Sequence, residues 1–264
     1  MYDFEYVKPH TLAGAVSALG REEAQAIAGG QTLIPTLKAR LAQPSQLVDL
    51  SGVREMHGIT VKDGTVRIGA VTRHAEVEHS AELRSTFPAL ADLASRIGDP
   101  QVRNRGTLGG SVANNDPSAC YPAAVLGTGA TVETNSREIG ADDYFLGMFA
   151  TALEEGEIVT AVRFPVPEKA AYSKFVQPAS RFALVGAFVA KFPDGVRVAI
   201  TGASEEGVFR WSEAEQALSS SFSPDAVAGL SVPAEGMIGD IHGSPDYRAH
   251  LVGVMTKRAV EAAH

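Results

Sequence analysis

Apolar and polar residues in the first part of the chain alternate with the periods of short helices and short strands. Residues 11–20 (TLAGAVSALG) have the spacing of an amphipathic helix. Residues 59–68 alternate on both sides of Asp63-Gly64, a dipeptide typical of a β-hairpin turn. Residues 88–97 (PALADLASRI) place their apolar side chains on one face of a predicted helix.

A double glycine separates a predicted strand from a predicted helix near the start of the chain. Residues 24–28 (AQAIA) predict a buried strand that runs directly into Gly29-Gly30. The segment LIPTLKARL from Leu33 has helical spacing, with Thr32 placed as its N-cap. The predicted order is therefore strand, double glycine, helix start.

The second half of the chain predicts strands first and helices last. The segment 99–122 (DPQVRNRGTLGGSVANNDPSACYP) is so rich in Gly, Asn, Asp, Ser and Pro that a loop is expected for most of it. Strands are predicted for residues 46–50, 130–134, 158–164, 184–192 and 196–201, and helices for 143–153, 212–219, 224–230 and 246–263. The run FPVPEKAA marks an expected domain boundary, and the part beyond it has an α+β pattern.

Composition narrows the possible classes of function. The 264 residues carry a formal net charge of −8, which argues against nucleic acid or an anionic membrane as the main partner. The single cysteine, Cys120, cannot form an internal disulfide or hold an iron–sulfur cluster. His74 and His79 lack the spacing of a metal site and are interpreted as surface or loop residues. No segment is apolar enough to span a membrane, and the N-terminus lacks a signal peptide, so a cytoplasmic protein is expected.

The first glycine pair has the chemistry of a pyrophosphate-binding loop. Glycines allow backbone N–H groups to approach an anion closely, and the start of the following helix adds unpaired donors and a positive dipole. A Gly-Gly between a strand and a helix is, however, more often only a tight turn. The Gly-Lys-Ser/Thr of a P-loop and the Rossmann G-x-G-x-x-G are both missing from the chain. A nucleotide would therefore have to be bound by another fold.

A second glycine-rich segment, GTLGGS at 106–111, strengthens this interpretation. Its hydroxyls and the Asn114-Asn115-Asp116 run that follows can bond sugar hydroxyls and phosphate oxygens. Arg103 and Arg105 flank the segment. They are interpreted either as contacts to phosphate, ring or partner, or as salt-bridge residues that fix the loop.

Together these segments resemble a known family. IAGGQTLIP (27–35) and IGDPQVRNRGTLGGSVANNDPSA (97–119) are similar to the flavin-binding medium subunit of the molybdenum hydroxylases, which include xanthine dehydrogenases and aerobic carbon monoxide dehydrogenases. The resemblance extends to YVKP (6–9), EIVTAVRFPVP (157–167) and YSKF (172–175). It covers most of the chain, and residues after about 205 contribute little to it.

The resemblance implies an α+β protein with a two-subdomain FAD-binding fold of the vanillyl-alcohol-oxidase/PCMH type and a C-terminal α+β domain. The implied FAD-binding domain spans residues 1–165, with subdomains of about 1–57 and 58–165, and the C-terminal domain spans residues 166–264.

The resemblance also implies FAD and a set of residues around it. No catalytic residue and no metal ligand is expected. The implied cofactor-binding residues are Ala28, Gly29, Gly30, Gln31, Thr32, Leu33, Ile97, Gly98, Thr107, Gly109, Gly110, Ser111, Asn114, Asp116, Ile158 and Lys174. In this arrangement residues 28–33 enclose the pyrophosphate, while Ile97, Gly98 and Ile158 lie near the flavin ring. Cys120 stands where the family usually has an acidic residue, so either Asp116 replaces that carboxylate or FAD is bound less tightly.

The implied role is electron transfer within a larger complex. A molybdenum-cofactor large subunit oxidises the substrate, a [2Fe–2S] small subunit carries single electrons, and the flavin passes them to NAD, quinone or oxygen. A heterotrimer or a dimer of heterotrimers is expected. Two alternatives remain open at this point: a self-contained flavoenzyme of the same fold, such as an enolpyruvyl sugar nucleotide reductase, and a nucleotide-binding module without flavin.

Overall fold

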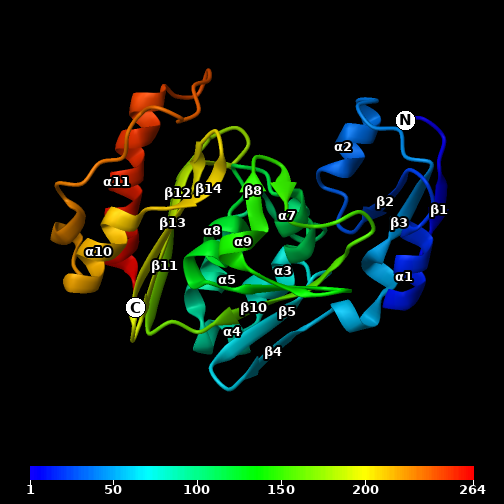
Figure 1. Cartoon of the computed structure of the whole chain (residues 1–264), viewed down its shortest axis with the longest axis horizontal. Helices are drawn as coiled ribbons and strands as arrows, with labels where there is room; N and C mark the ends of the chain where they lie inside the picture. Colours follow the sequence, from blue (N-terminus) through cyan, green and yellow to red (C-terminus); the bar gives the residue numbers. More distant parts are fainter.

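Three main β-sheets follow one another along the chain in the computed structural model, which describes all 264 residues (Figure 1). The N-terminal unit is a parallel sheet in the order β1-β3-β2 with two helices. Its elements are β1 (Glu5–Val7), α1 (Leu12–Leu19), β2 (Ala24–Ile27), α2 (Leu33–Lys38) and β3 (Gln46–Asp49). Two short 3-10 helices, η1 (Leu50–Gly52) and η2 (Arg54–Met56), lead out of it.

The central unit is an antiparallel sheet of five strands in the order β4-β5-β10-β6-β7. Its strands are β4 (Ile59–Lys62), β5 (Thr65–Gly69), β6 (Thr131–Thr134), β7 (Glu138–Gly140) and β10 (Val159–Pro165). Its helices are α3 (His74–His79), α4 (Ala81–Thr86), α5 (Pro88–Ser95), α6 (Pro100–Arg103), α7 (Leu108–Asn114), α8 (Tyr121–Thr128) and α9 (Ala141–Tyr144), with a small hairpin of β8 (Phe145–Gly147) and β9 (Ala150–Thr151).

The C-terminal unit is an antiparallel sheet of four strands in sequential order. It contains β11 (Lys169–Val176), β12 (Ala183–Phe192), β13 (Gly195–Ser204), β14 (Gly207–Arg210), α10 (Ser212–Ser220), the 3-10 helix η3 (Pro224–Val227) and α11 (Pro245–Ala262). Figure 1 shows this unit and the N-terminal unit at opposite ends of the molecule, with the central unit between them.

Helix α8 joins the central and C-terminal units into one core. All of its residues are buried, and it belongs to a cluster of 39 buried residues that also contains Phe188 of β12 and Ala199 of β13. A second cluster of 19 buried residues fills the space between the four-stranded sheet and helices α10 and α11. Residues 183–190 of β12 are therefore buried on both faces, which explains their nearly continuous apolar sequence.

Most elements predicted from the sequence are present, and four predictions are wrong. The strand at 24–27 is half exposed because it lies at the edge of its sheet. The segment 99–122 contains helices α6 and α7 as well as the start of α8, and 224–230 forms only the 3-10 helix η3. Residues 143–153 form α9 and the β8–β9 hairpin instead of one helix. The helix is interrupted there because Gly147 and Phe149 have φ angles of 152° and 55°.

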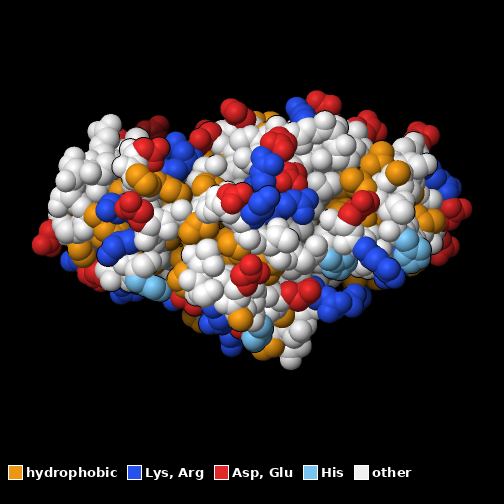
Figure 2. All heavy atoms as spheres, turned by 90° about the horizontal axis from the view of Figure 1, so that it is seen from below, with side chains coloured by type: hydrophobic (Ala, Val, Ile, Leu, Met, Phe, Trp, Pro, Cys, Tyr) orange, Lys and Arg blue, Asp and Glu red, His pale blue; other side chains and the backbone are white.

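The distribution of charge on the surface is that of an ordinary globular protein. Basic and acidic side chains are intermixed on the face drawn in Figure 2. None of the helices combines the length and the apolar character that crossing a bilayer requires.

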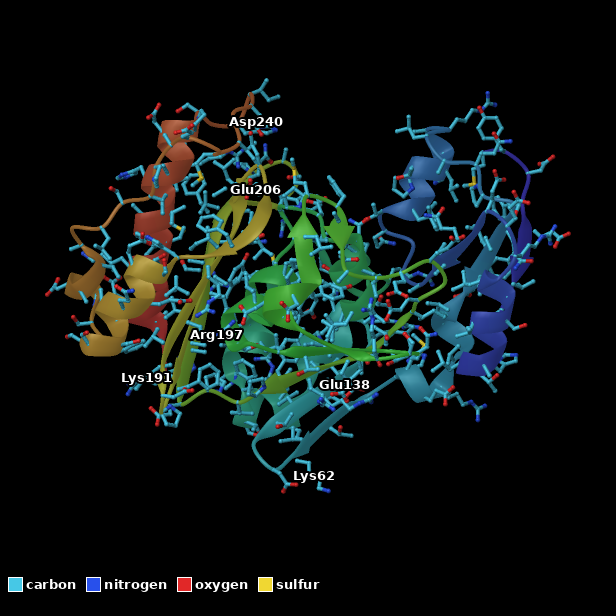
Figure 3. All side chains as sticks on the ribbon, in the orientation of Figure 1. Lys62, Glu138, Lys191, Arg197, Glu206 and Asp240 are labelled. Carbon is cyan, nitrogen blue, oxygen red and sulfur yellow. The ribbon has the colours of Figure 1, made fainter.

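A buried arginine connects the last helix to the C-terminal sheet. Arg248 of α11 is 3% exposed, and its NH1 group donates to the carbonyls of Leu184 and Gly202, both at 2.7 Å. Its NH2 group bonds Asp240 at 2.7 Å, at the upper end of this unit in Figure 3. The guanidinium thus satisfies two strand carbonyls and one carboxylate at once.

We expect Arg248→Met to destabilise the protein by roughly 3 kcal/mol, because it leaves two carbonyls and a carboxylate without their donor. Urea unfolding followed by circular dichroism measures this loss. Arg258→Met is the matched control, since Arg258 lies on the same helix and is exposed. Equal unfolding midpoints for the two variants would contradict this role of Arg248.

Candidate functional site

A cleft of about 670 Å³ lies where the three units meet, within the range of roughly 300–1,000 Å³ typical of ligand pockets. All sixteen residues predicted as cofactor-binding line this single cleft. They come from the β2–α2 turn, the α5–α6 turn, helix α7 and its C-terminal end, the start of β10, and β11. The structure therefore brings together side chains that are up to 146 positions apart, from Ala28 to Lys174.

The two glycine-rich segments touch each other directly. A Cβ atom on Gly29 would lie 2.6 Å from the Cα atom of Gly106 and would overlap the carbonyl of Arg105. Only a residue without a side chain permits this backbone-to-backbone approach. Gly30 has a φ of 68°, and a Cβ there would lie 2.6 Å from Ile34 Cδ1. Both glycines of the first pair are thus required by the shape of the cleft.

The turn between β2 and α2 has free hydrogen-bond donors. None of the backbone N–H groups from Gly29 to Leu33 has an acceptor within the protein, and the first N–H after them, from Ile34, donates to Gly30 O at 3.0 Å. Thr32 occupies the N-cap position as predicted, but its side chain makes no capping bond. Gly29 is buried, and Gly30 and Leu33 are half-buried, where N–H groups are normally paired, while Gln31 and Thr32 are exposed. Five consecutive donors without a protein acceptor at the start of a helix suit an anion.

The second glycine pair is built differently. It lies in the first turn of α7, where the N–H of Gly109 donates to Ala70 O at 2.8 Å and the N–H of Leu108 to Thr72 O at 3.1 Å. A Cβ on Gly109 would overlap Ala70, whereas one on Gly110 would meet only Thr107 Oγ1, at 2.9 Å. Gly109 therefore serves close packing, and Gly110 is exposed toward the cleft.

The residues of the polar run at the end of α7 have two different roles. Asn115 holds a neighbouring hairpin, whereas Asn114 and Asp116 face the cleft. Asn115 is buried, has a φ of 43°, and donates from its side-chain amide to the carbonyls of Gly147 and Ala150, both at 2.8 Å. The interpretation of Asn115 as a sugar-binding residue is therefore wrong, because its amide holds the β8–β9 hairpin. Asn114 and Asp116 line the cleft, and burial raises the pKa of Asp116 above its usual value.

The α5–α6 turn forms a second wall of the cleft and is held by two cations. Arg103 forms an ion pair with Glu78 at 2.6 Å and also donates to the carbonyls of Ile97 and Gly98. Of the two interpretations left open for Arg103, the structure supports the one in which a salt bridge fixes the loop. Lys174, which is 7% exposed, reaches this turn from β11 and donates to Arg96 O at 2.6 Å.

Ile158 is fixed by a polar network behind the third wall. Its N–H donates to Asn135 Oδ1 at 2.7 Å. The preceding carboxylate, Glu157, accepts from Arg137, Thr134 and Ser136 at distances between 2.7 and 3.0 Å. These bonds, led by the one from Arg137, lower the pKa of Glu157 to about 2.

Sequence reasoning missed His74 and part of the environment of Cys120. His74 is 5% exposed, lines the cleft and packs beside Tyr121, so the prediction of a surface or loop residue is wrong. Burial lowers its pKa to about 4. Cys120 is buried, and its sulfur lies 3.5 Å from Lys174 Nζ. No local pattern marks His74, because its burial results from the contact with Gly106 across the chain.

The geometry defines a class of binding protein. A cleft with a turn of free amide donors at one wall and apolar side chains at the others suits a dinucleotide whose phosphates meet the turn. The parallel strands, the glycine pairs and the short helices match neither a P-loop nor a Rossmann unit.

Comparison with known proteins identifies the family. Residues 2–167 match the family described as the FAD binding domain in molybdopterin dehydrogenase. The chain is 34% identical to the carbon monoxide dehydrogenase medium chain of Hydrogenophaga pseudoflava, over 98% of this chain and 96% of that one. It is 35% identical to the nicotine 6-hydroxylase medium subunit of Paenarthrobacter nicotinovorans, with the same coverage.

The likeness extends to three dimensions. A solved structure of the carbon monoxide dehydrogenase of Hydrogenophaga pseudoflava superposes with a TM-score of 0.89 at 34% identity, over 99% of this chain and 97% of that one. The chain therefore belongs to the FAD-binding subunits of the molybdenum hydroxylase family, a family of oxidoreductases. The predicted family, fold class and cofactor are confirmed.

We expect Glu157→Gln to lower the stability of the protein at pH 7 by about 2 kcal/mol after allowance for solvent around Arg137. The folded-state pKa of about 2 lies below the ordinary 4.5. The carboxylate therefore stabilises the fold above pH 4.5, and this contribution disappears as the pH falls toward 2. Urea unfolding between pH 7 and pH 2.5 measures the difference between wild type and variant.

The control for this prediction is Glu154→Gln, because Glu154 contacts the same Arg137 at 3.4 Å but is 78% exposed. Its effect should be small at every pH. A difference between wild type and Glu157→Gln that stays constant across the pH range would contradict the assigned pKa.

Proposed function

We propose that FAD lies extended along the cleft with its pyrophosphate against the β2–α2 turn. The single observation that carries this proposal is the run of free N–H groups from Gly29 to Leu33. Ala28 begins this turn, and Gln31 adds a side-chain amide that donates to Gly29 O at 3.1 Å and so keeps the turn compact. Donors in this number suit two linked phosphate groups.

The other walls would hold the remaining parts of the cofactor. Thr107, Gly110 and Ser111 would contact phosphate and ribityl oxygens, with Asn114 and Asp116 available for hydroxyl groups. Gly109 would act indirectly, because its N–H is already bonded to Ala70 O. Ile97, Gly98 and Ile158 would contact the flavin ring, and Lys174 would hold the wall beside it through Arg96 O.

Electron transfer is the function that this arrangement supports. FAD supplies the redox chemistry when bound, and the protein positions the ring and excludes water around it. The buried His74 is neutral at pH 7, and Asp116, Glu157 and Lys174 of the cleft are each hydrogen-bonded to groups of the protein. We therefore assign no acid–base catalyst. We propose that electrons arrive from [2Fe–2S] clusters on a small partner subunit, which a molybdenum-cofactor large subunit reduces, and leave to NAD, quinone or oxygen.

The support for this proposed assembly is the similarity of the chain to medium chains of other enzymes. A heterotrimer or a dimer of heterotrimers follows from the same proposal, and so does a cytoplasmic location. We also keep the division of the chain into an FAD-binding domain of residues 1–165, with subdomains of about 1–57 and 58–165, and a C-terminal domain of residues 166–264. Its support is the change from one sheet to the next between β10 and β11.

The test of the assembly is affinity purification of the tagged chain from its native cells. We expect a large molybdenum-containing chain and a small iron–sulfur chain to co-purify, identified by mass spectrometry, and FAD to be released on denaturation. A yellow protein that purifies alone and reduces a small substrate would support a self-contained flavoenzyme. A protein that remains colourless with added FAD would support a module without flavin.

Gly110→Val tests the position of the cofactor. A branched side chain there should project into the cleft and weaken FAD binding by about 1.4 kcal/mol or more, that is at least roughly tenfold. Fluorescence titration of the apoprotein with FAD measures the change. Unchanged affinity in a folded variant would refute the placement.

Gly14→Val is the matched control for Gly110→Val. Gly14 occupies the same position of helix α1, and its N–H donates to the capping hydroxyl of Thr11 at 3.2 Å, the same distance as from Gly110 to Thr107. Gly14 lies outside the cleft, so Gly14→Val should change helix stability and leave the affinity for FAD intact.

A further inference from the structure

Three consecutive carbonyl groups in the α5–α6 turn are each bonded by a cationic side chain. Lys174 donates to Arg96 O at 2.6 Å. Arg103 donates to Ile97 O at 3.2 Å and to Gly98 O at 3.4 Å. The two cations come from different elements, β11 and α6, so the orientation of this turn is determined from two sides.

These bonds control which atoms of the turn face the cleft. A trans peptide places its N–H opposite its C=O. With the Ile97 carbonyl turned toward Arg103, the N–H of Gly98 points away from Arg103, and it has no acceptor within the protein. Gly98 also has a φ of 50°, which a residue with a side chain rarely adopts. The wall thus keeps a defined shape, which glycine adopts without strain.

Glu78 determines the position of Arg103. The carboxylate of Glu78 accepts from Arg103 Nε at 2.6 Å, and the two side chains are 14% and 13% exposed. At this depth charges interact more strongly than in water. The field of Arg103 reaches the cleft, because its charge, after burial, contributes to the lowered pKa of His74.

We propose that Arg103, oriented by Glu78, is a positioning residue that fixes the Ile97–Gly98 wall against the flavin ring and sets the reduction potential of the bound FAD. The inference rests on the proposed function, since it takes the cleft as the flavin site. The ring becomes more negative as it accepts electrons, so a nearby guanidinium favours the reduced cofactor and the Glu78 carboxylate offsets that effect.

The test is the two-electron reduction potential of FAD bound to the full chain, measured by spectroscopic titration against reference dyes. Glu78→Gln keeps an oxygen that can accept from Arg103 and removes the negative charge. We expect the potential to become less negative, with the equilibrium shifted toward reduced FAD about tenfold, equivalent to about 30 mV for two electrons. Arg103→Met should shift the potential in the opposite direction.

Arg103→Lys separates charge from positioning. Lysine keeps the charge but lacks the planar fork that bonds two carbonyls and a carboxylate together. We expect its potential to lie between those of wild type and Arg103→Met, and its visible circular dichroism, which reports the surroundings of the ring, to differ from that of wild type.

The matched control is Arg163→Met, which breaks the ion pair with Glu138 on the central sheet, outside the cleft (Figure 3). Its bound FAD should keep the wild-type potential. If Arg103→Met fails to fold, the reduction potential of FAD bound to Glu78→Gln still tests the proposal. Normal FAD binding with an unchanged potential in Glu78→Gln would overturn the proposed control of the reduction potential by the Glu78–Arg103 pair, whereas a wild-type chain that binds no FAD would overturn the proposed function as well.

Discussion

The architecture of the cleft depends on backbone packing against backbone at two glycines. Gly29 lies against Arg105 and Gly106, and Gly109 lies against Ala70. Each contact joins segments that are far apart in the sequence, and each is too close for a Cβ atom. The first contact brings the N-terminal sheet up to the central unit, and the second fixes α7 on the end of β5. Together they set the distance between the two walls that would enclose a dinucleotide.

Within that frame, the two turns that face the cleft differ in how their polar groups are satisfied. The β2–α2 turn leaves its N–H groups free, whereas the α5–α6 turn has its carbonyls bonded by Lys174 and Arg103. Free donors favour an anion, and a turn with occupied carbonyls presents a stable, largely apolar surface. The difference fits a ligand with a charged middle and a flat aromatic end. It also makes the C-terminal unit part of the site, because Lys174 belongs to β11 and Thr201 of β13 donates to the carbonyls of Pro117 or Ala119 beside Cys120.

The sequence predicted much of this from local chemistry. Glycine pairs, the Asp63-Gly64 turn and the apolar runs of β12 and β13 depend on rules that act within a few residues. The errors at residues 143–153 and at His74 come from tertiary contacts. Residues 143–153 have a composition compatible with a helix, but the amide of Asn115 bonds Gly147 O and Ala150 O and keeps them in a hairpin. His74 gives no local sign of burial, and the separate functions of Gly109 and Gly110 follow only from what each faces.

Cys120 stands where the family usually has an acidic residue, and the structure shows what its side chain contacts. Family resemblance suggested that an acidic residue is missing here and that FAD would lose a hydrogen-bond acceptor. The structure places the sulfur 3.5 Å from Lys174 Nζ, so a carboxylate at this position would first pair with the lysine. In this chain the ammonium is instead satisfied by Arg96 O and Arg181 O, at 2.6 and 2.8 Å. Its charge has no carboxylate partner, and together with Arg103 it makes the wall beside Ile97 and Gly98 more positive. With cysteine instead of a carboxylate at position 120, the wall beside Lys174 carries one negative charge less.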